Sequence, residues 1–167
     1  MQLRRTTGSG TAGLAAGTLL ATVLLSACDI TGMNAATNRE YTPAAGANAR
    51  DAAVDVLGAV IVSDQAGSGT FVATFVNNSA TSAATVDSLT AAAGTPELKV
   101  GEFSSIDVPA RGLVNLADDD QGIAVTGDFE AGRFVRVTIG LGDADQVTLN
   151  VPVVPDDHEF DGLDQTA

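Results

Sequence analysis

The sequence is poor in the residues that carry most enzyme and metal chemistry. Its 167 residues include no tryptophan, one cysteine (Cys28) and one histidine (His158). A catalytic nucleophile needs a base held beside it, yet His158 lies among acidic residues near the C-terminus, far in sequence from the cysteine. No Gly-x-Ser-x-Gly motif is present. We therefore expect no catalytic residue, no enzymatic activity and no cofactor, and we interpret His158 as a solvated tail residue.

Positive charge is also scarce. The chain carries 8 lysine and arginine residues against 21 acidic residues, which gives a formal net charge of −13. Every acidic residue follows Cys28, so a chain that begins at Cys28 carries 6 − 21 = −15 charges. So negative a field argues against a nucleic-acid partner and against binding to anionic lipid through basic patches. The ordinary role of such a negative charge is to keep a protein soluble, and it also allows cations to bind loosely.

Long apolar runs are missing beyond the N-terminus. Residues 12–25, AGLAAGTLLATVLL, follow the basic start MQLRR and precede small residues, as in a secretory signal. A membrane-spanning helix needs about 20 apolar residues, so residues 1–27 are predicted to be a signal peptide. The glycines of residues 8–13 match G-x-G-x-x-G, but they lie within this signal and follow no strand, so they predict no nucleotide site.

The single cysteine directly follows this signal. Leu25, Ser26, Ala27 and Cys28 resemble the lipobox of bacterial lipoproteins. The resemblance implies diacylglyceryl transfer to the Cys28 sulfur and cleavage before Cys28, which anchors the chain on the extracytoplasmic face of the cell membrane. Two acyl chains suffice for stable anchoring, at about 0.8 kcal/mol per buried methylene. A free thiol beside an ordinary cleavage site is the alternative.

The rest of the chain divides into three segments. Residues 28–50 are polar and rich in Ala, Asn and Thr, and we expect a flexible tether after the lipidated cysteine. Residues 156–167 are acidic, and we expect a disordered tail. Residues 51–155 between them are rich in Val, Thr and turn residues and are predicted to form a β domain.

Three stretches of this domain show the two-residue period of a strand. They are residues 70–76, 133–141 and 146–154. Shorter candidates lie between them, separated by turn sequences, so we expect an all-β, immunoglobulin-like or cupredoxin-like β-sandwich of seven to nine strands. The alternative for residues 86–93 is a short helix. The side chains predicted to point inward on the last two strands are Val135, Val137, Ile139, Leu141, Val147, Leu149, Val151 and Val153. On the first of these strands, Phe134, Arg136 and Thr138 are predicted to point outward.

The order of several motifs in the domain resembles a known family. The stretches FVNNSATSAATVDSLTAAAGTPELKV, IDVPARGLVNL, GIAVTGDFEAGRFVRVTIGL and VTLNVPVVP are similar in order and spacing to the LpqE-like surface lipoproteins of actinobacteria. Those proteins in turn look like the periplasmic copper chaperone family PCu(A)C, a cupredoxin-like β-sandwich. The resemblance spans residues 54–155 and implies the fold.

The same resemblance argues against a copper site. The copper chaperones hold Cu(I) with His and Met, soft ligands for a soft ion. The resemblance places their ligand positions near Lys99, Gly122 and Ala124, and none of these residues ligates copper. After Cys28 the sequence has only Met33, in the tether, and His158, in the tail. We therefore expect no metal ligands of the family type.

Clustered aspartates offer a different cation site. They are Asp118, Asp119 and Asp120 in one turn and Asp143 and Asp145 in another. Asp-x-Asp begins an EF-hand loop, but the later Asp, Gly and Glu of that loop are missing. Turn aspartates that bond their own backbone are the favoured interpretation, with Ca²⁺ binding as the alternative.

Two further groups of residues have a structural and a functional interpretation. Asn77-Asn78-Ser79 matches a glycosylation motif, but the bacterial lipobox favours a turn. Phe103, Phe129 and Phe134 are expected to pack in the core, with an apolar binding surface as the alternative.

These observations predict a non-enzymatic lipoprotein of the cell envelope with a binding or structural role. The expected partners are the membrane, through the lipid anchor on Cys28, and an envelope protein or polymer, but not nucleic acid. The alternative function is metal binding, of copper or calcium, at a non-standard acidic site.

Overall fold

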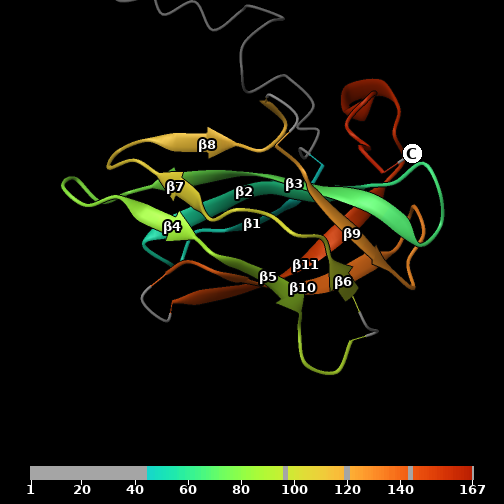
Figure 1. Ribbon diagram of the computed structural model, residues 1–167, viewed down its shortest axis with the longest axis horizontal. Coiled ribbons are helices and arrows are strands. Elements are labelled where there is room, and N and C mark those ends of the chain that lie inside the picture. The colour runs from blue at the N-terminus through green and yellow to red at the C-terminus, as the bar shows by residue number, and fades with distance from the viewer. Residues whose placement is uncertain (1–44, 96–97, 119–120, 143–144, 167) are drawn as a thin grey trace, which may run out of the picture. The chain divides into compact units, whose positions relative to one another are not determined.

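A computed structural model describes residues 45–95, 98–118, 121–142 and 145–166. The predicted signal peptide and lipobox, with Cys28, lie outside these ranges. No helix in the described part of the chain is long and apolar enough to cross a bilayer. The elements are β1 (Ala47–Ala49), β2 (Val54–Val62), β3 (Ser68–Asn77), β4 (Ala84–Val86), β5 (Ser88–Ala91), β6 (Leu98–Val100), β7 (Ile106–Val108), β8 (Leu113–Asn115), β9 (Ile123–Gly127), β10 (Phe134–Gly140), β11 (Gln146–Val154) and the 3-10 helix η4 (His158–Phe160) (Figure 1).

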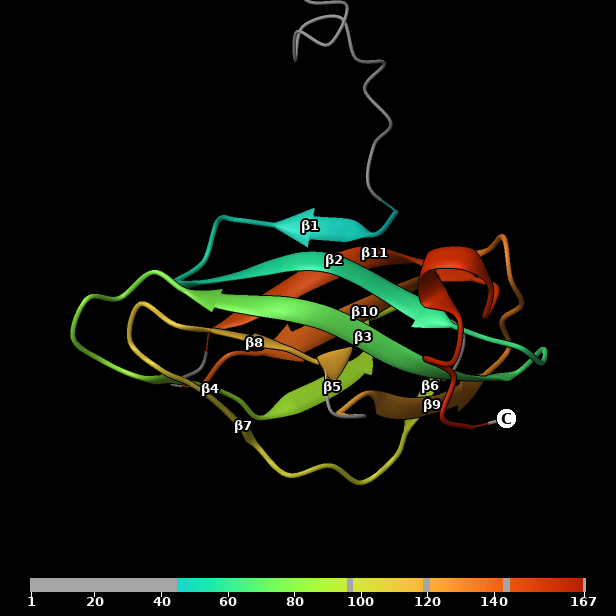
Figure 2. The same ribbon diagram turned by 90° about the horizontal axis from the view of Figure 1, so that it is seen from above.

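Nine of the strands form one sheet that folds over on itself, as Figures 1 and 2 show. Their order is β5-β10-β11-β2-β3-β9-β6, with β1 beside β2 and β8 beside β3, while β4 and β7 pair separately. All pairs are antiparallel except β11 and β2. The predicted all-β sandwich is confirmed. The structure has more strands than the seven to nine expected. The strands β1 and β6, of three residues each, are too short to show a periodic pattern, and residues 84–91 form two strands, β4 and β5.

The alternation in β10 and β11 correctly predicts which side chains face the core. Val137, Ile139 and Val151 are fully buried, whereas Phe134 and Arg136 point outward and are exposed. The two strands pair directly, with Val137 opposite Leu149 and Val135 opposite Val151. Successive residues of a strand point to opposite faces, so this register puts the apolar residues of both strands on one face.

The centre of the core is formed by β2 and β3. Phe71 and Phe75 have no exposed surface, and they pack with Val56, Val60 and Ile61 of β2. Both strands are covered on two faces, which is why β2 is a nearly continuous apolar run and not an alternating one. Removal of either phenylalanine ring would cost about 3–5 kcal/mol.

Residues 84–91 form strands, and the alternative of a short helix over 86–93 is wrong. Val86 pairs with Ile106 of β7 and Leu89 pairs with Ile139 of β10, and both side chains are buried. The exposed Asp87 lies between the two strands. Pairing with two different partners therefore decides the conformation of a segment whose alanines alone would suit a helix.

The folded unit begins earlier than the predicted tether boundary at residue 50. β1 lies along β2, with Ala47 opposite Ala59, and Gly58 N donates a hydrogen bond to Asn48 Oδ1 at 2.9 Å. Gly58 has a φ of +61°, a conformation that favours glycine, and lies where the β2–β3 register shifts. At this bulge the Gly58 N–H is free to bond Asn48 of β1, and the pattern of apolar residues could not predict this contact.

The last residues also differ from expectation, because residues 156–166 are folded and not a disordered tail. We call them the C-terminal segment. Phe160 and Leu163 pack against the core, and Asp164 is only 9% exposed. In Figures 1 and 2 the segment, in red, lies at the end of the sandwich where β2 turns into β3. Two apolar residues among the acidic ones thus fix a segment that its composition marks as disordered.

The Asp164 carboxylate holds this segment in place. Its Oδ2 accepts a hydrogen bond from Asp64 N (2.8 Å), and its Oδ1 accepts bonds from Thr166 N (2.9 Å), Thr166 Oγ1 (2.7 Å) and Thr70 Oγ1 (3.3 Å). Gln165 N in turn donates to Thr70 Oγ1 at 2.8 Å. Hydrogen bonds to a carboxylate are stronger than neutral ones, so one side chain fastens the segment to β3.

Candidate functional site

The positions that the resemblance assigns to copper ligands do come together in the fold. β6 pairs with β9, so that Lys99 lies opposite Thr126, and Gly101 N donates to Ala124 O at 2.7 Å. Lys99 and Ala124 are both exposed, and they are diagonal neighbours on this pair of strands. Their side chains, an ammonium group and a methyl group, offer no electron pair to a soft metal ion at neutral pH.

The third of these positions, Gly122, has no room for a side chain. A Cβ atom built there would overlap Cγ2 of Thr70 and would lie 3.4 Å from Nε2 of Gln165. Thr70 cannot turn away freely, because its hydroxyl is bonded to Asp164 and Gln165. The C-terminal segment therefore helps to make glycine necessary here, because it holds Thr70 in the place that the Cβ atom of a histidine or methionine would take.

The other candidate metal ligands are not assembled within the described residues. His158 is exposed, and its Nδ1 lies 3.1 Å from Oδ1 of Asp157. Asp118 accepts a hydrogen bond from Asn115 Nδ2 at 3.1 Å, as a turn aspartate does. In the described ranges, no three His, Cys, Asp or Glu residues gather where they could hold a metal ion. The donors present do not fit a Cu(I) site.

Several predicted site residues lie outside the described ranges or in turns. Asp119, Asp120 and Asp143 belong to the first group, so the acidic cluster is described only at Asp118 and Asp145. Asp145 forms a turn through its backbone, since its N–H donates to Gly142 O at 2.8 Å. This part of the calcium hypothesis stays a prediction.

The Asn-Asn-Ser motif is a turn, as predicted. Asn77 is buried, and its Oδ1 accepts a hydrogen bond from Ser79 N at 2.9 Å. Its Nδ2 donates to Ser82 O at 2.9 Å and to Val108 O at 3.0 Å. The side chain therefore replaces backbone partners at the end of β3, which is a structural role.

The three phenylalanines considered as core or binding residues separate in the structure. Phe129 is 6% exposed and belongs to the core, and Phe103 is half-buried against it. Phe134 is 63% exposed, so core packing was the wrong expectation for this residue. Phe134 stands on the outward face of β10, where the alternation had placed it.

Phe134 lines two adjoining hollows, which we call together the Phe134 groove. The first has a volume of about 220 Å³ and the second about 490 Å³. Asp128, Phe129 and Phe134 line both. The first is also lined by Thr95, Leu98, Val135, Arg136 and Asn150, and the second by Ala66, Gly67, Gly127, Glu130 and Arg133.

The groove exists because β5 is shorter than β10. Pairing between them covers Val137 to Gly140 of β10, and a last bond runs from Ala92 N to Arg136 O at 2.9 Å. The chain then turns away at Gly94, whose φ is +82°. Phe134, at the start of β10, consequently has no partner in β5, and the space beside it stays open.

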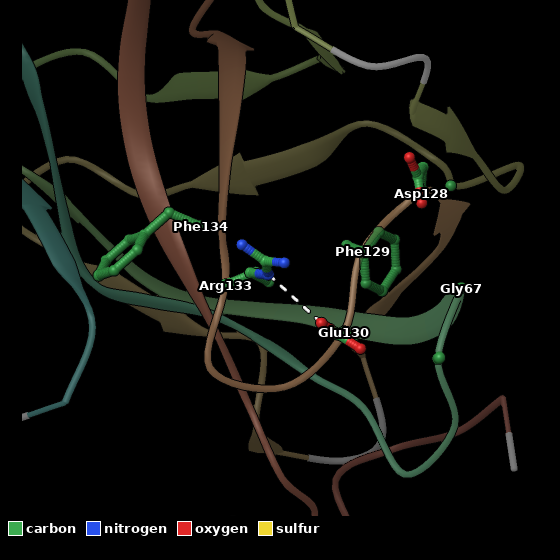
Figure 3. Close-up of a pocket in the computed structure, with 8 residues that line it drawn as sticks. Gly67, Asp128, Phe129, Glu130, Arg133 and Phe134 are labelled. Atoms are coloured by element: carbon green, nitrogen blue, oxygen red, sulfur yellow. Dashed lines mark hydrogen bonds and ion pairs between the residues drawn. The ribbon is translucent and has the colours of Figure 1, made fainter.

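The second hollow is shaped by the loop between β9 and β10. Gly67 N donates to Phe129 O at 2.8 Å, which ties this loop to the β2–β3 turn. Arg133 Nε lies 3.3 Å from Glu130 Oε1, and both side chains are more than half exposed. Figure 3 shows this pair with the Arg133 guanidinium between the rings of Phe129 and Phe134 in that view. The ring, the ion pair and the carboxylate of Asp128 are the chemical groups offered to a ligand.

Sequence patterns could predict only some of the groove residues. The outward position of Phe134 followed from the alternation in β10, and an outward phenylalanine between Arg133 and Arg136 is the signal that was available. Asp128 and Asn150 were missed, because their nearness to Phe134 depends on a loop and on the pairing of β10 with β11, in which Asn150 lies opposite Arg136.

Comparison with known proteins gives structural matches only. No protein-family model matches the chain, and no curated protein matches it significantly. Three solved structures are similar: the copper-bound PCuAC domain from PmoF2 (13% identity, TM-score 0.50), the apo PCuAC domain from PmoF1 (12%, 0.52) and the apo PmoF2 PCuAC domain (12%, 0.51). The matches cover 65–67% of this chain and 97–98% of those domains. Residues 45–166 thus contain a β-sandwich with the fold of PCuAC copper chaperone domains.

Proposed function

We propose that this protein is a non-enzymatic lipoprotein of the bacterial cell envelope, of the LpqE-like kind, that binds an envelope partner through a copper-chaperone-like β-sandwich. The lipobox Leu25-Ser26-Ala27-Cys28 supports the anchor on the extracytoplasmic face of the membrane. The −15 charge of the chain from Cys28 onward suits a domain held in water above that membrane.

The observation that carries the choice of a role other than copper transfer is the closed position at Gly122. The similar solved domains include one with bound copper. Here Thr70, whose hydroxyl is bonded to the C-terminal segment, occupies the space that the Cβ atom of a ligand side chain would need at Gly122. Lys99 and Ala124 beside it bring no soft donor. These positions thus keep the fold of the similar domains but lack the soft donor atoms that Cu(I) binding requires.

Two measurements test this proposal. Mass spectrometry of the mature protein should find a chain that begins at Cys28 and carries acyl mass, whereas a Cys28→Ala variant should be released or stay unprocessed. A Ser26→Ala variant keeps a small residue and serves as the matched control that should still be lipidated. An unmodified mature chain that begins elsewhere would contradict the anchor.

Titration calorimetry tests the absence of a metal role independently. We expect no binding heat when Cu(I), Cu(II) or Ca²⁺ is added to micromolar protein. Heat from any of the three would overturn the proposed non-metal role and favour a non-standard acidic site, for which the Asp118–Asp120 turn would be the first region to mutate.

A further inference from the structure

We propose that the Phe134 groove binds a neutral saccharide chain, with one sugar ring in each of its two hollows. This inference rests on the binding role proposed above and names its ligand class.

The exposed aromatic ring is the first argument. Phe134 is 63% exposed, and the only other large apolar side chain of the described residues with comparable exposure is Leu113, on β8. An exposed aromatic ring next to a hollow is a feature of binding sites. The face of a phenyl ring packs flat against the C–H face of a sugar ring, and it loses little conformational entropy in doing so because it has two rotatable bonds.

The polar groups around the ring match sugar hydroxyls. Asp128 only accepts hydrogen bonds, Arg136 only donates them, and the Asn150 amide does both. Arg136 and Asn150 are cross-strand neighbours, and all three side chains are exposed. A hydroxyl group is both donor and acceptor, so a ring with several hydroxyls can satisfy this mixed set, whereas an apolar ligand would leave it unpaired.

Charge favours a neutral ligand over an anionic polymer. Asp128 and Glu130 offset Arg133 and Arg136 within the groove. The chain as a whole carries a net charge of −13, so a polyanion would be repelled at long range.

The dimensions favour connected rings. The first hollow, of about 220 Å³, is smaller than the roughly 300–1,000 Å³ of pockets that enclose a drug-sized molecule. The second, of about 490 Å³, shares Asp128, Phe129 and Phe134 with it. One ring in each hollow, joined across Phe134, fits this arrangement.

An extended peptide is a poorer fit. Strand addition needs a row of free backbone groups on a sheet edge. β5 covers β10 as far as Arg136, so only the backbone of Phe134 remains free on that edge within β10.

The test is binding of neutral oligosaccharides to the full-length chain in detergent. The probes are tetrasaccharides of glucose, galactose, mannose and arabinose, with a polyglutamate chain and an uncharged extended peptide as comparisons. We expect calorimetry to detect at least one of the saccharides and neither of the comparisons. Phe134→Ala should weaken that binding by about tenfold or more, while Leu113→Ala, the other exposed apolar residue, should leave it unchanged.

Conservative variants separate ring stacking from simple apolar contact. Phe134→Tyr should retain binding, and Phe134→Leu should lose it. Circular dichroism should show that every variant is folded, since Phe134 is exposed. No binding of any tetrasaccharide, binding that survives Phe134→Ala, or binding of the peptide in place of the sugars would each overturn the inference, and none of these results would touch the lipid anchor.

Discussion

The C-terminal segment and the Phe134 groove use polar side chains in opposite ways. In the segment, the Asp164 carboxylate accepts four hydrogen bonds from the protein. In the groove, Asp128, Arg136 and Asn150 make no side-chain hydrogen bond to another described residue and face solvent. Side chains of the first kind stabilise the fold, whereas side chains of the second kind are available to a ligand. Substitutions in the two regions should therefore affect different measurements.

The largest contrast is expected between two phenylalanines that line the same groove. Phe129→Ala should lower the free energy of unfolding by about 3–5 kcal/mol, because its ring is 6% exposed and a cavity would remain. Phe134→Ala should change it by less than about 0.5 kcal/mol, because the ring is in water. Urea unfolding followed by circular dichroism measures both. Equal losses would mean that Phe134 also supports the core.

The next effect concerns the attachment of the C-terminal segment. Asp164→Ala should destabilise the protein by about 2–3 kcal/mol, since it removes the bonds to the carboxylate and leaves Asp64 N and Thr166 N without their acceptor. Asp161→Ala is the matched control, because Asp161 is an exposed aspartate of the same segment. A control variant as unstable as Asp164→Ala would show that general charge, and not the hydrogen bonds, holds the segment.

The same carboxylate should make stability depend on pH. Burial, the largest single effect, raises the pKa of Asp164, but hydrogen bonds from Asp64, Thr166 and Thr70 together hold the pKa below its ordinary value of 3.8. A lowered pKa means that the stabilisation is complete above the unfolded-state pKa and is lost as the pH falls through the folded-state pKa. The difference in unfolding free energy between wild type and Asp164→Asn should therefore be constant at neutral pH and shrink below about pH 4. A difference that is constant down to pH 2 would contradict this assignment.

The smallest effect is expected for the ion pair of the groove. Glu130→Gln should change the free energy of unfolding by less than about 0.5 kcal/mol, because both partners of the Arg133–Glu130 pair are exposed. Added salt should leave wild type and variant equally stable. A clear, salt-sensitive loss would place this pair among the groups that hold the fold and not among those offered to a ligand.

The parts of the structure that the sequence predicts are those with a periodic pattern. Val135, Val137 and Ile139 could be assigned to the core because the two-residue period of a strand is visible over β10. Asp164 could not, because its environment depends on Asp64 and Thr70, which lie about a hundred residues away. Gly122 was noticed only as a position without a copper ligand, and the overlap with Thr70 that makes glycine necessary appears only when the chain is folded.

The groove follows the same rule. The alternation placed Phe134 outward, but the hollow beside it depends on where β5 stops, and β5 was a segment for which strand and helix were both considered. The local pattern thus predicted the direction of the Phe134 side chain, whereas the groove beside it results from the non-local pairing of β5 with β10.

The parallel pairing of β11 with β2 has a consequence for the order of folding. Val153 lies opposite Ile61, and Asp64 is joined to Asp164, 100 residues later. Contacts between such distant parts of a chain close slowly, and the second partner must be present before they can close at all. When only the first half of this chain has emerged from a ribosome or a secretion channel, β11 is not yet available to pair with β2, and Asp164 is not yet available to bond Asp64. This arrangement delays closure of the sandwich until almost the whole chain has emerged.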